Sequence, residues 1–199
     1  MKTLLSVLVI FQLMLCSRVS YPQYTNEEKT GLLYTLQEEK AAFDFYTEMF
    51  SKYNQKVFEN VLNAEKVHQE HVMNLLNELN IDPSGYSQSA GEFSIKDVKD
   101  IYDLLMKTGG FSLTDALLAS ARYEEKDISD LRNFSSKAEN ERIKSLYDCL
   151  DKASQNHLRA FVRNLKREGI NYKPSILNAD DYDLIISNKD QPGDCFQNK

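Results

Sequence analysis

Apolar residues recur at intervals of three, four and seven along most of the chain, the spacing that places side chains on one face of an α-helix. The first such segment runs from about residue 27 to 53, and Thr25 or Asn26 can cap its start. The second runs from about residue 57 to 79 and ends before Asp82-Pro83-Ser84-Gly85, a sequence that breaks helices. Their inward residues are Leu32, Leu36, Phe43, Tyr46 and Phe50, then Phe58, Val61, Leu62, Val72, Leu75, Leu76 and Leu79. The pattern predicts two antiparallel helices joined by a short turn.

The second half of the chain repeats this arrangement after a loop. A short helix is expected from about residue 95 to 107, where Thr108-Gly109-Gly110 stops it. A third long helix should begin after Ser112, with Asp115 in a capping arrangement, and run to about residue 133; a fourth covers about residues 139 to 167. The predicted fold class is therefore an all-α, four-helix bundle with a short extra helix in the crossover between the second and third long helices.

The N-terminus has the character of a signal peptide. Lys2 precedes an apolar run that reaches Cys16 and ends in polar Ser17-Arg18-Val19-Ser20, too short for a comfortable membrane span of roughly 20 residues. We expect a signal peptide at 1–20, the bundle at 21–170, and a tail at 171–199 that packs on the bundle or trails from it. Cleavage would leave a secreted, extracellular protein with no membrane contact; retention as an anchor is the less favoured alternative.

The charge of the chain argues against nucleic acid as a partner, and its cysteines allow one disulfide. Acidic residues outnumber basic ones by 30 to 24, so the chain lacks the basic excess that binding to nucleic-acid phosphates requires. After signal cleavage, Cys149 and Cys195 would remain in an oxidising compartment. They either form one disulfide or stay separate, Cys149 as a buried thiol and Cys195 as a tail residue.

Ionisable residues interrupt the apolar face of every long helix. Glu65 and His68 form a Glu-x-x-His pair, a spacing that places both side chains on one side of one helical turn. The predicted inward set is Glu39 on the first helix, Glu65 and His68 on the second, Glu124 and Asp127 on the third, and His157 on the fourth. Glu38 and Glu125, 100° further round their helices, are expected at the edges.

Burial of these groups needs a common explanation, because an unpaired buried carboxylate costs several kcal/mol. A cation held between the helices supplies one. Carboxylate and imidazole ligands suit iron or manganese, and two ions can be held where a carboxylate bridges them. The alternative is a secreted helical interaction protein without metal, whose polar core is held by Glu–His and Glu–Arg pairs. His71, three residues after His68, is either a partly exposed histidine or an outer partner of the site.

Four strings together resemble a known family. They are Glu38-Glu39-Lys40-Ala41-Ala42-Phe43-Asp44-Phe45-Tyr46, Ala64-Glu65-Lys66-Val67-His68, Glu124-Glu125-Lys126-Asp127-Ile128-Ser129-Asp130-Leu131 and Ser154-Gln155-Asn156-His157-Leu158-Arg159-Ala160-Phe161. The chain is similar, from about residue 32 to 186, to the ferritin-like superfamily and within it to the rubrerythrin-like DUF2202 family. The resemblance implies a di-iron type of bundle with Glu39, Glu65, His68, Glu124 and His157 as ligands.

One position departs from the full di-iron pattern. Ser154 stands where a second Glu-x-x-His would place its carboxylate, and a hydroxyl is a poor iron ligand. Asp127 could replace the missing oxygen donor, or the site could hold one firm and one labile ion. The DUF2202 branch shares this serine.

The resemblance also implies an oxidoreductase activity, with Fe or Mn as cofactor and O₂ or peroxide as reactant. Ferrous oxidation and peroxide reduction are the two expected reactions; the residues leave open whether turnover occurs and whether the chain forms an oligomer. Rubrerythrins proper carry a cysteine-rich electron-entry domain, and this chain has no such cysteines. Metal sequestration or ferroxidase turnover is therefore favoured over peroxidase activity.

Overall fold

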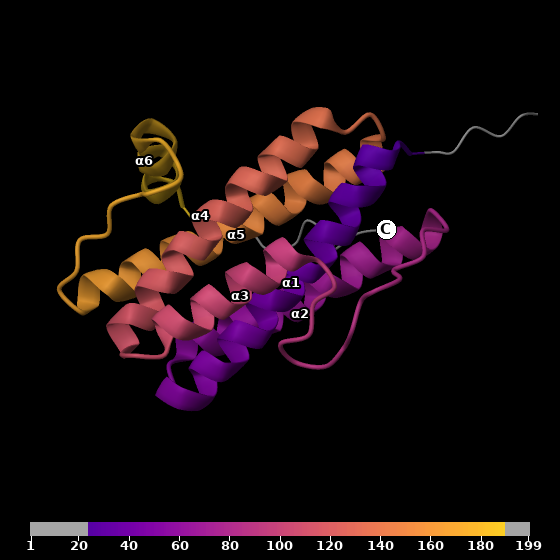
Figure 1. Cartoon of the computed structure of the whole chain (residues 1–199). Coiled ribbons are helices and arrows are strands. Elements are labelled where there is room, and N and C mark those ends of the chain that lie inside the picture. The colour runs from indigo at the N-terminus through magenta and orange to yellow at the C-terminus, as the bar shows by residue number, and fades with distance from the viewer. Residues whose placement is uncertain (1–23, 190–199) are drawn as a thin grey trace, which may run out of the picture.

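The computed structural model describes residues 24–189, which form six α-helices and no strand (Figure 1). The helices are α1 (Asn26–Tyr53), α2 (Lys56–Glu78), α3 (Lys96–Gly109), α4 (Leu113–Lys137), α5 (Glu141–Arg167) and α6 (Ala179–Ser187). The all-helical prediction is confirmed, and α4 extends four residues beyond its expected end. The expected signal peptide and Cys195 lie outside the described residues. Cys149 is buried on α5 and is disulfide-bonded.

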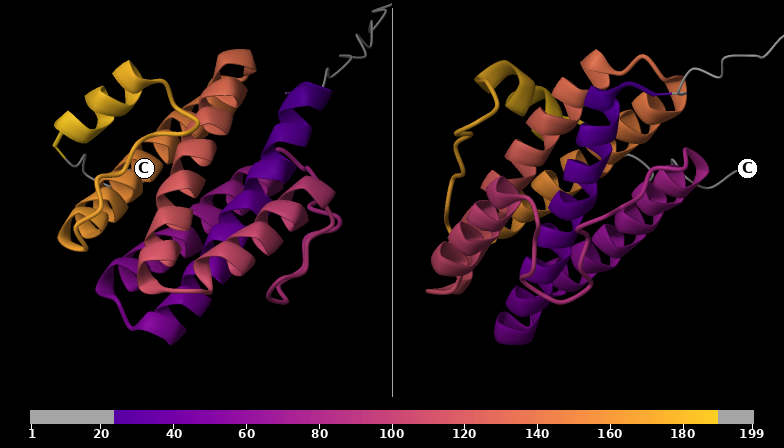
Figure 2. Two further views of the ribbon diagram at one scale, coloured as in Figure 1. Left: turned by 60° about the vertical axis from the view of Figure 1, so that its left-hand side comes forward. Right: turned by 45° about the vertical axis from the view of Figure 1, so that its right-hand side comes forward.

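The four long helices form two pairs, and the two pairs pack against each other. α1 packs along α2 and α4 along α5, while α2 contacts α5 and α1 contacts α4. α3 packs against α1 and α4, and α6 packs on α5 at the side of the molecule away from α2 and α3 (Figure 2). The result is a helical bundle whose interior is formed by all four long helices.

Side-chain caps explain where the helices begin. Thr25 forms a capping box with Glu28: Thr25 Oγ1 accepts from the Glu28 amide at 3.1 Å, and Glu28 Oε2 accepts from the Thr25 amide at 2.7 Å. Ser112 caps α4 by accepting from the Asp115 amide at 3.1 Å, as predicted. Asn54 ends α1 in the left-handed conformation, which asparagine tolerates and which turns the chain into α2.

α1 is surrounded, which the sequence pattern did not anticipate. Every residue from 35 to 42 is buried, because α2, α3, α4 and the loop after α2 cover all sides of this stretch. Lys40 donates to Asp44 at 2.6 Å and to the Ser89 carbonyl at 2.8 Å, and Gln37 Oε1 accepts from the amides of Ser94 and Ile95. These bonds fasten the loop over the helix that carries Glu39.

The tail is held against α4 and α5 by buried polar groups. Glu125 accepts hydrogen bonds from the amides of residues 175, 176 and 177 and from the Tyr172 hydroxyl. Further along, Arg159 donates to the Ile185 carbonyl at 3.0 Å, and the Tyr182 and Ile185 side chains join the hydrophobic core. Within residues 24–189 no helix has both the length and the apolar character needed to cross a membrane.

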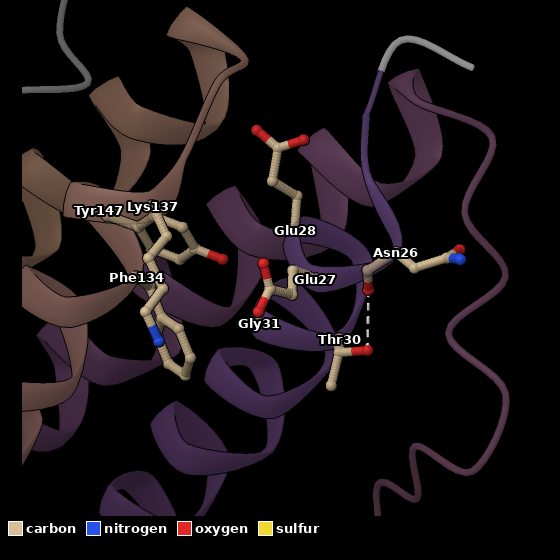
Figure 3. Close-up of a pocket in the computed structure, with 8 residues that line it drawn as sticks. All are labelled: Asn26, Glu27, Glu28, Thr30, Gly31, Phe134, Lys137 and Tyr147. Atoms are coloured by element: carbon tan, nitrogen blue, oxygen red, sulfur yellow. Dashed lines mark hydrogen bonds between the residues drawn. The ribbon is translucent and has the colours of Figure 1, made fainter. Parts of the chain in front are cut away.

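A pocket of about 350 Å³ opens at the end of the bundle where α1 begins (Figure 3). Gly31 and Phe134 line it, and the Tyr147 hydroxyl lies so near that a Cβ on Gly31 would meet it at 2.8 Å. None of the six predicted metal ligands borders this pocket. The pocket is therefore separate from the site described next.

Candidate metal centre

The middle turns of the long helices bring five of the six predicted site residues together. α1 contributes Glu39, α2 contributes Glu65 and His68, α4 contributes Glu124, and α5 contributes His157. Their ligand atoms form two groups, Glu39 with Glu65 and His68, and Glu65 with Glu124 and His157; within each group the atoms lie within 4.8 Å of one another. Each of the five residues is at most 8% exposed.

The first group is organised around His68. Its Nδ1 lies 3.1 Å from Glu39 Oε2 and 2.8 Å from Glu65 Oε2. The contact with Glu65 follows from the three-residue spacing on one helix, whereas the contact with Glu39 requires α1 to pack against α2. One nitrogen thus faces two carboxylates.

The second group is organised around His157. Its Nδ1 lies 3.0 Å from Glu65 Oε1 and 3.4 Å from Glu124 Oε2, although neither contact has hydrogen-bond geometry. Glu65 therefore presents one oxygen to each histidine, and the two imidazole rings stack with centroids 5.6 Å apart. This shared carboxylate joins the two groups.

Asp127 lies beside the two groups without belonging to either. It is buried, and Ser154 Oγ donates to its Oδ2, so the serine holds the aspartate in place. The other oxygen, Oδ1, is buried without a hydrogen-bond partner. Burial raises the pKa of Asp127 well above its usual range, and the negative charges of Glu39, Glu38 and Glu124 raise it further, so Asp127 interacts with one carboxylate of each group.

Burial and charge together set the protonation of the site. Burial raises the pKa of Glu39 well above its usual range, and the charge of Glu65 raises it further. For Glu65, burial is outweighed by the positive charges of His157 and His68, so its pKa is lowered. Burial would lower the pKa of His68, but Glu39 and Glu65 raise it to about 9. Without metal, protons on the imidazoles therefore balance part of the negative charge.

The donor set fits a cation. Glu39 Oε1, Asp127 Oδ1 and His157 Nδ1 are all buried without a hydrogen-bond partner, and such atoms are rare in a folded protein unless an ion or water satisfies them. Carboxylate oxygens and imidazole nitrogens are ligands that iron and manganese accept. The arrangement can hold one ion in each group, with Glu65 between them.

Two tyrosines surround the site on the side of α1 and α4. The Tyr46 hydroxyl donates to Glu124 Oε1, and the Tyr123 hydroxyl donates to the Glu38 carbonyl at 2.6 Å. Both hydroxyls are buried. The first bond fixes a predicted ligand, and the second ties α4 to the turn of α1 that carries Glu39.

The predicted edge positions of Glu38 and Glu125 were wrong. Both are at most 1% exposed. Glu38 pairs with Lys126 of α4 at 2.9 Å, and burial raises its pKa to about 7 against the opposing charge of Lys126. Glu125 is covered by the tail. A residue at the edge of a helix face is exposed only if solvent lies beside it. Here α4 lies beside Glu38 and the tail lies beside Glu125.

His71 belongs to neither group and is partly buried. Burial lowers its pKa, and the positive charge of His68 lowers it further, so the two rings are close enough to interact. Three polar interactions were not predicted from the sequence. They are the Lys40–Asp44 pair, the Glu38–Lys126 pair and the hydrogen bonds by which Glu125 holds the tail. The four-residue spacing of Lys40 and Asp44 is the one sequence signal that could have indicated the first.

A family model described as an uncharacterized protein domain, DUF2202, matches residues 28–189. The chain belongs to the DUF2202 family. The uncharacterized protein MJ0754 of Methanocaldococcus jannaschii is 38% identical over 169 residues, which cover 85% of this chain and 91% of that protein. The crystal structure of hypothetical protein MJ0754 from Methanococcus jannaschii is similar with a TM-score of 0.82, covering 84% of this chain and 95% of the other.

Proposed function

We propose that this DUF2202 protein is a secreted, ferritin-like metal-binding protein that holds two ions of iron or manganese inside a four-helix bundle. The observation that carries the proposal is the position of Glu65, whose two oxygens each face a different histidine. A carboxylate between two sets of nitrogen and oxygen donors is the arrangement that bridges a pair of ions. α3 would then be the extra helix in the crossover of a ferritin-like bundle.

The two positions would differ in their ligands. Glu124 and His157 would hold one ion, and Glu39 and His68 the other, with Glu65 bridging. Asp127 would complete the position of Glu39 and His68 with its unpartnered Oδ1, supplying the carboxylate that is missing at Ser154. Ser154 would act by fixing Asp127 and would not itself be a ligand.

When bound, a pair of redox-active ions would supply electrons to O₂ or peroxide, which is the chemistry of ferroxidases and peroxide reductases. The protein would exclude bulk water, since every proposed ligand is at most 8% exposed, and would orient the carboxylates through Tyr46 and Ser154. Carboxylate-rich ligation stabilises the higher oxidation state. Metal sequestration and ferroxidase turnover are the two activities that we propose for this site.

One observation favours a second candidate, a metal-free helical interaction protein. His68 makes hydrogen bonds of 2.8 and 3.1 Å to Glu65 and Glu39, the kind of pairing that would hold a polar core without an ion. That reading leaves Glu39 Oε1 and Asp127 Oδ1 without partners. In the metal-binding proposal, the bound ions are the partners of these two oxygen atoms.

Metal analysis tests the proposal directly. The purified chain, reconstituted anaerobically with Fe(II) or with Mn(II), should retain close to two ions per chain after desalting. Glu65→Gln should reduce retention to below one, because the shared ligand is lost from both positions. Glu70→Gln on the exposed face of the same helix is the matched control and should retain both ions. Failure of the unaltered chain to bind either metal would favour the interaction protein.

The histidines provide an independent check with a built-in comparison. His68→Ala should lower metal affinity, whereas His71→Ala, one turn further along α2, should leave the number of bound ions at two. Equal losses in the two variants would contradict the assignment of His68 as a ligand. Oxygen consumption on mixing the protein with Fe(II) then decides between ferroxidase turnover and storage of a bound ion.

A further inference from the structure

A second groove, of about 350 Å³, lies between α3, α4 and the tail, apart from the candidate metal centre. α3 and α4 run side by side there (Figure 1), and Ile176 of the tail forms the third wall. Its lining is largely aliphatic: Ile101, Leu104 and Leu105 from α3, Leu118 and Ala119 from α4, and Ile176 from the tail. Cavities of roughly 300–1,000 Å³ with such a lining are typical of sites for small organic ligands.

The groove keeps apolar side chains in contact with solvent. Leu104 is 55% exposed and Ile176 is 41% exposed. The exposure of Ile176 does not come from a loose tail, since Glu125 accepts hydrogen bonds from its amide at 2.8 Å and from those of its two neighbours. A buried carboxylate thus holds an apolar side chain at the wall of an open groove, and a preformed wall lowers the ordering cost of binding.

The charges along the groove are unevenly distributed. Asp115 lies at one end, where α4 begins, and accepts from the Ser112 hydroxyl at 2.6 Å. Two and three turns later along α4, Arg122 and Lys126 line the groove. Lys126 is engaged by Glu38, Asp130 and Tyr34, but Arg122 is exposed and makes no hydrogen bond or ion pair within residues 24–189. The end near Arg122 therefore has an unpaired cation beside an apolar surface.

We propose that this groove binds an aliphatic carboxylate, with the hydrocarbon chain between Leu104 and Ile176 and the carboxylate on the Arg122 guanidinium. A guanidinium binds a carboxylate through two parallel N–H donors. The aliphatic walls exclude water from the chain of the ligand, and the acidic end at Asp115 sets the direction in which the ligand lies. The proposal does not depend on metal binding.

Three probes of equal chain length separate the contributions of charge and apolar contact. Decanoate, decanol and decylamine are titrated calorimetrically into the metal-free full chain below their aggregation concentrations. Decanoate should bind most tightly and decylamine least. Arg122→Gln should weaken decanoate at least threefold and leave decanol unchanged, while Leu104→Ser should weaken both. Lys107→Gln, an exposed cation of α3 outside the groove, is the control and should change neither.

Other results overturn the proposal. Binding of decanol as tight as that of decanoate, or an equal loss of both in Arg122→Gln, would remove the role of the cation. Absence of saturable binding would remove the site, and a dimer that Leu104→Ser dissociates would show that a second copy of the chain covers the groove. Arg122 and Leu104 are exposed, so both variants should keep the unfolding midpoint of the original chain.

Discussion

The hydroxyl of Tyr46 on α1 donates a hydrogen bond to Oε1 of Glu124 on α4. Both residues are at most 1% exposed, and the tyrosine ring stacks against both Phe58 and Phe161, which also contact each other, so the hydroxyl has little freedom to move. The bond leaves Glu124 Oε2 facing His157 at 3.4 Å. A core tyrosine thereby fixes the orientation of a proposed ligand, the role that hydrogen bonds around metal sites commonly have.

Tyr46→Phe should therefore affect both stability and metal binding. The loss of a hydrogen bond to a buried carboxylate should lower the free energy of unfolding of the metal-free chain by about 1–3 kcal/mol. Metal affinity at the position held by Glu124 should fall about 10-fold or more. Urea unfolding and metal titration measure these effects. Tyr53→Phe on the same helix is the control, because its hydroxyl donates to the Gly109 carbonyl, and it should leave metal affinity unchanged.

Asp127→Asn should separate the two proposed metal positions. Asparagine keeps the shape and can still accept from Ser154, but it brings no negative charge to the ion. We expect one ion to remain bound and the affinity for the second to fall at least 10-fold, as counted by metal analysis after desalting. Removing a buried carboxylate whose pKa burial raises should leave the metal-free chain as stable as before or more so. Retention of both ions with unchanged affinity would exclude Asp127 as a ligand.

Glu28→Gln should reveal a pH-dependent link between two helix ends. Besides capping α1, Glu28 Oε1 accepts from the amides of Glu139 and Asn140 at 2.8 and 2.7 Å, just before α5. Burial opposes ionisation, but these backbone bonds outweigh it and lower the pKa of Glu28 below its usual 4.5. At pH 7 the variant should be less stable by about 1–2 kcal/mol, the size of a lost cap.

The sign of the pH effect follows from the lowered pKa. Because the Glu28 carboxyl is more acidic in the folded chain than in the unfolded one, its contribution is complete above pH 4.5 and is lost as pH falls through the folded pKa. The difference between Glu28→Gln and the original chain should shrink in acid, measured by urea unfolding from pH 7 to pH 3. Glu27→Gln, the exposed neighbour, should show no such convergence. A constant difference across this range would argue against the cap.

Glu125→Gln should loosen the tail. The amide offers one acceptor oxygen and places an N–H₂ group against backbone donors that the carboxylate had satisfied. We expect a loss of about 1–3 kcal/mol and faster hydrogen exchange of the amides of residues 175–177, with α1 and α2 unaffected. Glu168→Gln, at an exposed position after α5, is the comparison. Unchanged exchange in the tail would show that other contacts hold it.

The helix pattern predicted from sequence agrees with the structure because it depends on local rules. Thr25 and Ser112 cap α1 and α4 as expected, since a capping hydroxyl needs only the amide three residues away. The convergence of Glu39, Glu65, His68, Glu124 and His157 could also be anticipated, because each interrupts an apolar face and four such faces must share one interior.

The burial of Glu38 and Glu125 could not be predicted from helical spacing. The pattern placed Glu38 and Glu125 at helix edges, yet Lys126 and the tail cover them. Their burial depends on residues 47 to 88 positions away in sequence, which no helical periodicity encodes.

The sequence by itself determined that this chain is all-helical, where the five predicted helices begin, and that Glu39, Glu65, His68, Glu124 and His157 face inward, because spacing and capping act within one or two turns. Only the tertiary structure decided that Glu65 lies between both histidines, that Asp127 lies beside the two groups, and that α1 is enclosed. Those features require the distances between helices, and the packing of whole side-chain faces sets these distances.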